Sequence, residues 1–521
     1  MSGLRILAAL GFPLGFGLLA VALGKDDNWD LLHYHFYNPH AWLHGRHGHD
    51  LLAADFHVYF NPLLDLPFHL GNRVLPGAAL TFLLGALHGL SGLLLWGIAG
   101  HVLDRRAGVP PVVPALVGML GAGSLYVLGT TYYDALVALP VFLAMWLILR
   151  RADLVFAGPA SRALPLLVLA GIAAGAGVGL KQTVIVFAAG IGLALLLTPG
   201  RRVAAMLAYG LGGAIGVLAT SGFWLWHLWE TTGNPLFPYF NHVFRSPLGP
   251  IADMRTRHAL PRDLWEALVY PWVMLRMPWR VDSPVRDPKL LVAYVLVPAG
   301  LVLALLRPRA ANLLAERRAA LFVLFTIAAG YLIWLYLFSI YRYAIPLEML
   351  APLAVVAAVG FLPLAGRAAR LLALALMLVV LPIQPSNRDR IPWAGALWSP
   401  FVAVAPPEGM ALDDALVVVP GWHRGWRPNA FVIPFFPPEV PFLRIVAHDD
   451  PAGRLVTGFD GEIAQRIATH EGSLLVLMTP GGEAPVAASL ARHGLVADFA
   501  ACRRLTTSIG GPLALCPLRR G

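Results

Sequence analysis

The segment from Gly24 to Arg46 concentrates ionisable and aromatic side chains directly after a hydrophobic run, and it reads G-K-D-D-N-W-D-L-L-H-Y-H-F-Y-N-P-H-A-W-L-H-G-R. Ionisable groups crowded at the end of such a run usually mark a site, because an anchor alone needs none of them. If the segment is α-helical, Asp30, His33, Tyr34 and Tyr37 share one face. This face would offer a carboxylate, an imidazole and two phenols to a docked molecule.

Further polar groups follow in short segments between hydrophobic runs. They are Asp55, His57, Asn61 and Asp65 in D-F-H-V-Y-F-N-P-L-L-D-L-P, Asp134 in G-T-T-Y-Y-D, Lys181 in G-L-K-Q-T, and Arg342 and Tyr343 in S-I-Y-R-Y-A-I-P-L-E. Glu348 ends the last motif inside a hydrophobic run, where an unpaired carboxylate is costly. We therefore expect Glu348 to pair with Arg342.

The composition predicts that hydrophobic helices position these groups. Hydrophobic residues make up 58% of the chain and charged residues 13%, against about 25% charged in soluble domains. Apolar runs of about 17–25 residues predict about eleven membrane spans. They cover 4–23, 75–98, 110–129, 134–149, 163–180, 182–198, 203–222, 289–306, 320–338, 344–363 and 369–384. The first run has no small-residue cleavage motif before Lys25, so we expect a retained span.

Arginine placement predicts the topology. With a cytoplasmic N-terminus, the inner loops contain Arg5, Arg105, Arg106, Arg150, Arg151, Arg162, Arg201, Arg202, Arg307, Arg309, Arg317, Arg318, Arg367 and Arg370, and the short outer loops only Lys25, Arg46, Arg73, Lys181 and Arg342. This bias follows the positive-inside rule. It places the polar motifs, the 223–288 loop and the C-terminal tail outside the cytoplasm. It also explains much of the net charge of +10 without a nucleic-acid partner.

The tail beyond the last span has the pattern of a small α/β domain. Short β-rich runs at 415–419, 430–434, 442–446 and 473–478 alternate with Pro/Gly turns, and a helix is expected near 459–470. Both cysteines, Cys502 and Cys516, lie in this tail. A disulfide between them would suit an oxidising compartment, and two buried free thiols are the alternative. The G-I-A-A-G-A-G-V-G run at 171–179 predicts close helix packing.

Carboxylates, one lysine and one arginine around a membrane-edge pocket fit the transfer of a sugar from a lipid phosphate carrier. The leaving phosphate needs cations, which arginine supplies in bidentate fashion and lysine as a point charge. The acceptor hydroxyl needs a carboxylate base within hydrogen-bond reach. We therefore expect the outer loops to form the polar pocket and the spans to bind the lipid tail.

Three motifs carry a family resemblance: W-D-L-L-H-Y-H-F-Y-N-P-H-A-W-L-H-G-R after the first span, the outer G-N-P-L-F-P, and Y-R-Y before a late span. Over about residues 1–385 the chain resembles GT-C superfamily bacterial integral-membrane glycosyltransferases that use polyprenyl-phosphate-linked sugars. The family hallmark is an acidic residue just after span one, where Asp30 stands. Many members have D-E or D-D there, whereas Leu31 follows Asp30, so the base is open among Asp26, Asp27, Asp30 and Asp134.

The resemblance implies an α-helical polytopic membrane protein of about eleven transmembrane helices with a GT-C-like fold. The expected domains are 1–384, a transmembrane domain with outer loops 24–74 and 223–288, and 385–521, a small periplasmic α/β domain. The implied location is the bacterial inner membrane, with the N-terminus cytoplasmic. The implied reaction is inverting transfer from a polyprenyl-phosphate sugar to a glycan, lipid or protein acceptor on the outer face.

The candidate site residues divide by role. The catalytic candidates are Asp30, Asp27 and Asp134, and the substrate- or phosphate-binding candidates are Lys181, Arg342, Tyr343, His33, Tyr34, His35, Asn38, His57 and Asn61. Each group has a structural alternative: Asp30 and Asp134 as helix caps, and Lys181 and Arg342 as side chains that reach lipid headgroups. No cofactor is firmly implied. A metal held by His33 with Tyr37, or by His44, His47 and His49, is the less favoured reading.

Other function classes fit the same chain less well. A transporter or lipid flippase usually shows internal repeats and polar groups at mid-membrane, whereas here the polar groups gather at one face. A non-catalytic component of polysaccharide assembly would bind the lipid without transferring sugar, and only an activity measurement separates it from an enzyme. A lipid-linked glycan ligase or phosphoglycosyl enzyme would use the same pocket without a monosaccharide carrier.

Overall fold

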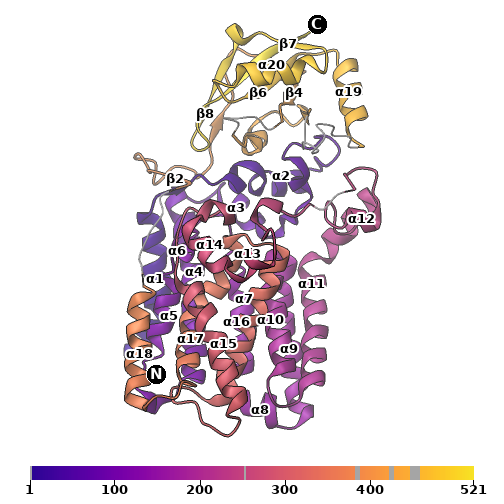
Figure 1. Cartoon of the computed structure of the whole chain (residues 1–521). Coiled ribbons are helices and arrows are strands. Elements are labelled where there is room, and N and C mark those ends of the chain that lie inside the picture. The colour runs from indigo at the N-terminus through magenta and orange to yellow at the C-terminus, as the bar shows by residue number, and fades with distance from the viewer. Residues whose placement is uncertain (1–2, 252–253, 382–387, 422–426, 446–457) are drawn as a thin grey trace. The chain divides into compact units, whose positions relative to one another are not determined.

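The computed structural model describes residues 3–251, 254–381, 388–421, 427–445 and 458–521. Its contacts divide the chain into two compact units. The first, called the helical unit, comprises 1–23, 81–222 and 255–388, and the second, called the sheet unit, comprises 24–80, 223–254 and 389–521. Figure 1 shows the elements of both.

Long apolar helices dominate the helical unit. In chain order its helices, long and short, are α1 (Gly3–Ala22), α4 (Gly77–Val102), α5 (Val112–Met119), α6 (Ala122–Tyr126), α7 (Ala138–Leu149), α8 (Ala152–Ala157), α9 (Ala160–Leu180), α10 (Ile185–Leu197), α11 (Arg202–Thr232), α13 (Leu264–Leu268), α14 (Tyr270–Arg276), α15 (Lys289–Leu306), α16 (Arg317–Leu337), α17 (Ile345–Val359) and α18 (Gly366–Val379). Among the described residues, six helical segments are long and apolar enough to cross a membrane. The chain is thus a multi-pass membrane protein.

Each predicted span contains a helix at its place in the chain, and the count of about eleven stays a prediction. The 110–129 span is not one helix, because α5 ends at Met119 and α6 begins at Ala122. Local capping sets some helix starts. The Glu316 carboxylate accepts hydrogen bonds from the backbone N–H groups of Arg318 and Ala319, which fixes the start of α16.

Glycines bring α9 and α11 into close contact. A Cβ added at Gly171 would lie 2.0 Å from the Tyr209 carbonyl oxygen, and one added at Gly175 would lie 2.0 Å from the Gly213 carbonyl oxygen. On α11, a Cβ at Gly216 would lie 2.2 Å from the Ile172 oxygen. Only residues without a side chain allow this approach, so the predicted packing role of the 171–179 run is confirmed.

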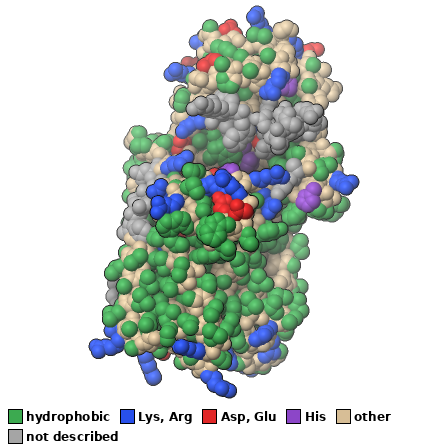
Figure 2. Space-filling model, viewed as in Figure 1, with side chains coloured by type: hydrophobic (Ala, Val, Ile, Leu, Met, Phe, Trp, Pro, Cys, Tyr) green, Lys and Arg blue, Asp and Glu red, His purple; other side chains and the backbone are tan. Residues whose placement is uncertain are grey.

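Exposed arginines flank the apolar helices of the helical unit. Arg105, Arg106, Arg150, Arg151, Arg307, Arg309, Arg318 and Arg367 are exposed, and Figure 2 shows basic side chains below a broad hydrophobic surface. The loops that carry them are neighbours, because Leu103 pairs with Ala315 and Arg201 donates to the Gly158 carbonyl. One end of the helical bundle is therefore rich in arginine.

The sheet unit contains short helices and two sheets. The helices are α2 (Tyr37–Leu43), α3 (Leu66–Gly71), α12 (Asn241–Phe244), α19 (Asp460–Thr469) and α20 (Glu483–Ala491). The strands are β1 (Lys25–Asp26), β2 (Arg390–Ile391), β3 (Val404–Ala405), β4 (Leu416–Val419), β5 (Phe442–Arg444), β6 (Leu474–Met478), β7 (Leu495–Ala497), β8 (Arg503–Thr507) and β9 (Leu513–Arg520). β1 pairs with β2, and the remaining seven strands form one sheet of order β3-β8-β9-β6-β4-β5, with β7 also on β9.

The strand directions make the large sheet mixed. β4 runs parallel to β5 and β6, and β9 runs antiparallel to β6, β7 and β8. The α/β character predicted for the tail is confirmed for its described residues. Of the predicted strands, 415–419, 442–446 and 473–478 contain β4, β5 and β6, and residue 446 lies outside the described residues. The predicted helix near 459–470 is α19.

One strand prediction is wrong. Residues Ala430–Phe435 form a short 3₁₀ helix instead of a strand. Pro434 lies inside this run, and proline cannot donate a ladder hydrogen bond. The Phe436 N–H instead donates to the Ile433 carbonyl, which closes the turn.

The units do not follow the predicted domains. Loop residues 24–80 and 223–254 belong to the same compact unit as the tail. The shared core explains this, because Leu51, Phe56 and Phe237 pack with Val418 and Val476 of the sheet. The predicted boundary between residues 384 and 385 lies outside the described residues. In the tail, Cys502 and Cys516 form a disulfide.

Candidate functional sites

The residues after Asp30 form a π-helical turn, Leu31–His35, before α2 begins at Tyr37. A π-turn is wider than an α-turn and aligns residues five apart. The condition under which Asp30, His33, Tyr34 and Tyr37 were expected to share one face, a regular α-helix, is therefore not met. The wider turn brings His35 to Asp30 instead. Such turns often occur at functional sites.

Asp30, His35 and Asp65 form a buried group in the sheet unit, which we call the aspartate–histidine cluster. His35 Nε2 lies 3.9 Å from Asp30 Oδ2, and His35 Nδ1 lies 2.6 Å from Asp65 Oδ1. All three residues are buried. The imidazole therefore lies between two carboxylates, an arrangement suited to accepting and holding a proton.

Aromatic rings pack beside this cluster. The His33 ring lies 4.3 Å from Trp29 and 5.0 Å from His57, and the Tyr34 ring lies 4.2 Å from His35 and 5.3 Å from His57, measured between centroids. These contacts fix the ring planes around the π-turn.

Two amide side chains of the predicted site support the backbone. Asn38 donates to the carbonyl oxygens of His57 and Phe60. Asn61 Oδ1 accepts from Leu63 N–H and caps a short 3₁₀ helix, Pro62–Leu64. Both contacts hold the loop that carries Asp65.

The neighbouring aspartates, Asp26 and Asp27, accept hydrogen bonds that fix the local chain. Both carboxylate oxygens of Asp26 accept from the Asn28 amide, and Asp27 Oδ1 accepts from Gly510 N–H at 2.5 Å. Burial raises the pKa of Asp27 above its usual range, although the Gly510 hydrogen bond opposes that shift. Asp27 thus fastens the 24–80 segment to the tail.

A second buried group lies in the helical unit and contains Asp134, Lys181 and Arg342, called here the two-cation cluster. Asp134 Oδ1 lies 2.9 Å from Lys181 Nζ, and Asp134 Oδ2 lies 3.3 Å from Arg342 Nη1. The exposed fractions of the Lys181 and Arg342 side chains are 13% and 14%, and that of Asp134 is 2%. One carboxylate between two cations leaves a net charge of +1 at a partly open position.

Tyrosines orient the two cations. The Arg342 guanidinium lies over the Tyr132 ring at 3.9 Å and near the Tyr343 ring at 5.8 Å. Lys181 Nζ donates to the Tyr132 carbonyl oxygen at 2.5 Å. A guanidinium stacked on an aromatic ring can also donate hydrogen bonds in its own plane. The structure thus brings together four of the candidate site residues, Asp134, Lys181, Arg342 and Tyr343, within this unit.

The two-cation cluster lies at the end of the bundle away from the exposed arginines. Lys181 follows α9, a helix of 21 residues that begins beside Arg162 and Gly158. At 1.5 Å per residue this helix is about 30 Å long, the thickness of a bilayer core. Arg342 likewise follows α16, which begins at Arg317. The cluster thus lies about one bilayer-core thickness from the arginine-rich end, where the opposite edge of a membrane is expected.

Glu348 does not pair with Arg342, so that prediction is wrong. The Glu348 carboxylate accepts hydrogen bonds from the Gly123 and Ser124 N–H groups and from the Tyr341 hydroxyl at 2.5 Å. It thereby caps α6, the second half of the divided span. A Cβ at Gly121 would lie 1.8 Å from Glu348 Oε1, so any side chain there would force the Glu348 carboxylate to shift.

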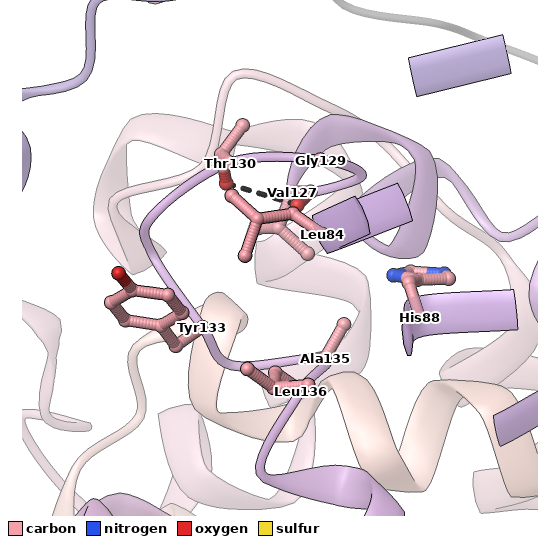
Figure 3. A pocket seen from close by; sticks show the side chains of 8 residues that line it. All are labelled: Leu84, His88, Val127, Gly129, Thr130, Tyr133, Ala135 and Leu136. Atoms are coloured by element: carbon pink, nitrogen blue, oxygen red, sulfur yellow. Dashed lines mark hydrogen bonds between the residues drawn. The ribbon is translucent and has the colours of Figure 1, made fainter. Parts of the chain in front are cut away.

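A small cavity is lined in part by residues of the 127–136 segment, which contains Asp134. Figure 3 shows its lining: Leu84, His88, Val127, Gly129, Thr130, Tyr133, Ala135 and Leu136. The His88 ring comes from α4 and lies within hydrogen-bond distance of Ser124, with 3.0 Å between Nε2 and Oγ. Tyr133 adopts a φ of 58°, a left-handed conformation that is strained for a bulky residue and is often seen beside functional groups.

The described residues contain no group of three or more His, Cys, Asp or Glu side chains arranged to hold a metal ion. His44 Nδ1 lies 2.9 Å from the His40 carbonyl oxygen, to which it can only donate, and His47 packs against Trp224 and His227. Burial lowers the pKa of His47 to about 4 and favours its neutral form.

The comparisons with known proteins give little. No known protein-family model and no curated protein matches the chain. Among solved structures, the chain is similar to the Archaeoglobus fulgidus oligosaccharyltransferase tethered to an acceptor peptide with the NVT sequon. The TM-score is 0.45 at 12% identity, over 92% of this chain and 70% of that one. A likeness at this level carries no argument about fold, site or activity.

Two residues gain importance only from the structure. Asp65 stood in the first loop without a role, and Tyr132 was absent from the predicted site. Asp65 meets His35 from thirty positions further along the chain, a pairing that no local pattern encodes. Tyr132 precedes Asp134 by two positions. Its place beside a candidate carboxylate in the G-T-T-Y-Y-D motif could have identified it from the sequence.

Proposed function

We propose that this protein transfers a sugar from a polyprenyl-phosphate donor to an acceptor hydroxyl. The observation that carries the proposal is the two-cation cluster, in which Lys181 and Arg342 share the single carboxylate of Asp134. Its net positive charge suits a phosphodiester. Its place at the end of apolar helices suits a phosphate that is attached to a lipid tail.

The cations would act on the leaving group. As the bond between the anomeric carbon and the phosphate oxygen breaks, its electron pair stays on the phosphate and adds negative charge there. Lys181 and Arg342 would stabilise that charge, and the Tyr132 ring under Arg342 would keep its N–H groups aimed. A polyprenyl phosphate stabilised in this way leaves without a general acid.

The acceptor needs a base, and we assign that role to Asp30. Its carboxylate would take the proton from the acceptor hydroxyl as the oxygen bonds to the anomeric carbon from the opposite side, which inverts the configuration. His33, Tyr34 and His57 would contact the sugar or the acceptor. Asp134 serves as counter-ion to the cations, and Asp27 as a structural link.

The compartment proposed is the bacterial inner membrane, with the N-terminus and the arginine-rich end cytoplasmic and the tail periplasmic. The arginine bias supports this orientation. The Cys502–Cys516 disulfide also supports it, because such bonds persist in oxidising compartments. The acceptor would be a glycan, lipid or protein of the envelope.

The test is sugar transfer in membranes from a panel of radiolabelled polyprenyl-phosphate monosaccharides, with the wild type compared with Asp30→Asn at matched expression. We expect transfer from at least one donor and a loss of about 100-fold or more in Asp30→Asn. Asp153→Asn is the matched control, since Asp153 is exposed on α8. Equal transfer by wild type and Asp30→Asn would remove Asp30 as the base, and no transfer from any donor would contradict the proposal.

A further inference from the structure

The aspartate–histidine cluster contains more than a base. A lone base needs one carboxylate, whereas this cluster adds an imidazole and a second carboxylate in the same buried space. Burying charged groups is costly unless they interact. The observed order is Asp30, His35, Asp65, with the imidazole between the carboxylates.

The two nitrogens of His35 have different surroundings. Nδ1 lies 2.6 Å from Asp65 Oδ1, an ion-pair contact in which the negative carboxylate favours a proton on Nδ1. In the neutral ring, Nε2 then carries the lone pair. Nε2 lies 3.9 Å from Asp30 Oδ2. The tautomer set by Asp65 therefore aims an acceptor at the proposed base.

We propose that Asp65 and His35 are positioning residues that take up the proton from Asp30, an inference that rests on the proposed glycosyl transfer. The proton leaves the acceptor hydroxyl for Asp30 Oδ2 as the new C–O bond forms. It then passes to His35 Nε2, and Asp65 stabilises the resulting imidazolium. Asp30 is thereby returned to its carboxylate form, and the imidazolium must then release the proton to water before the next acceptor reacts.

The π-turn makes this arrangement available. Asp30 and His35 are five positions apart, a spacing that places them on different faces of an α-helix. In the turn Leu31–His35 they meet. Tyr34 packs on the His35 ring at 4.2 Å and limits its rotation. Catalytic hydrogen bonds are often long before substrate docks, which suits the 3.9 Å separation.

The first arm of the test reads the tautomer without any substrate. The full chain is labelled with ¹⁵N-histidine in detergent or nanodiscs, and His35 is identified by the signal lost in His35→Gln. We expect a protonated Nδ1 and an unprotonated Nε2 in the wild type, and a weaker preference for this tautomer in Asp65→Asn, whose neutral amide can accept from Nδ1–H or donate to Nδ1. A protonated Nε2 in the wild type, or an unchanged tautomer preference in Asp65→Asn, would overturn the proposal that Asp65 sets the tautomer of His35.

The second arm measures transfer. We expect His35→Ala to lower kcat by about 10- to 100-fold with KM changed less than about 3-fold, and added imidazole to restore part of the rate. Asp65→Glu should retain more activity than Asp65→Asn. His40→Ala is the matched control, because His40 stacks on His44 outside the cluster.

The two arms separate the possible failures. Unchanged kcat in His35→Ala, or a loss that imidazole does not relieve, would overturn the proton-acceptor role. Wild-type protein that transfers no sugar would overturn the proposed function and this role with it. The expected tautomer result would in that case still support the Asp65–His35 pair.

Discussion

Asp134 Oδ1 lies 2.9 Å from Lys181 Nζ, although α7, α8 and α9 separate the two residues along the chain. The Asp134 carboxylate also meets Arg342, which comes from a third segment of the helical unit. Three segments at one end of the helical bundle thus meet at one carboxylate. With two cations and one anion, the cluster has a net charge of +1.

Asp134→Asn should destabilise the helical unit. Without the carboxylate, Lys181 and Arg342 repel each other while they remain mostly buried, and such losses cost about 1–3 kcal/mol. We expect a lower midpoint of thermal unfolding in detergent. Asp153→Asn, on the exposed surface of α8, should leave the midpoint unchanged. An unchanged midpoint in Asp134→Asn would show that the carboxylate is not needed to hold the two cations together.

Gly121→Ala should disrupt the start of α6. The added methyl group would lie 1.8 Å from Glu348 Oε1, so the carboxylate must leave the Gly123 and Ser124 N–H groups. We expect a cost of about 2–4 kcal/mol, read as a drop in the thermal midpoint. Gly100→Ala is the matched control, because nothing lies within 4 Å of an added Cβ there. Equal midpoints in the two variants would contradict the capping role of Glu348.

The sheet unit should lose stability in mild acid because of His69. Burial lowers the pKa of His69 to about 4, whereas an unfolded histidine titrates near 6.5. The unfolded chain therefore binds the proton first, and stability falls as pH decreases from about 6.5 to about 4, then levels off. Replacing His69 with Leu should reduce this slope in pH-dependent unfolding. His44→Leu, at an exposed histidine, should not. A slope that is the same in His69→Leu would refute the assignment.

Reduction of Cys502–Cys516 should weaken the tail. The bond closes a separation of 14 residues, for which loop entropy predicts about 3 kcal/mol. We expect Cys502→Ser with Cys516→Ser to speed proteolysis within the sheet unit relative to the oxidised wild type. A thiol reagent should label the native wild-type chain only after reduction. Labelling without reduction would show that the cysteines are free.

The sequence predicted most helices of the helical unit, because a helix that crosses a membrane needs a long run of apolar residues. Lys181 and Arg342 were selected as candidates because cations at the expected outer ends of spans run against the arginine bias, and the structure places both beside Asp134. The sequence prediction failed where local geometry departs from the regular period. The π-turn after Asp30 gives no apolar signal, so His35 was not placed against Asp30.

Contacts between residues far apart in the sequence were the other limit on prediction. Glu348 was assigned to Arg342 because the two are close in sequence, yet a carboxylate can also satisfy backbone N–H groups at a broken helix. The break at Gly121 was visible only as two glycines in an apolar run. The joining of residues 24–80 with the tail depends on contacts such as Leu51 with Leu443, which no periodicity encodes.

The central claim is that the two-cation cluster binds a lipid-linked phosphate, and the most direct measurement is affinity in nanodiscs for polyprenyl phosphate against uncharged polyprenol. A charge-assisted contact contributes about 1.5–3 kcal/mol, or about 10- to 100-fold. We predict that the wild type prefers the phosphate by at least about 10-fold, and that Lys181→Gln with Arg342→Gln abolishes the preference. Equal affinity for both lipids in the wild type, or an undiminished preference in the variant, would contradict the claim.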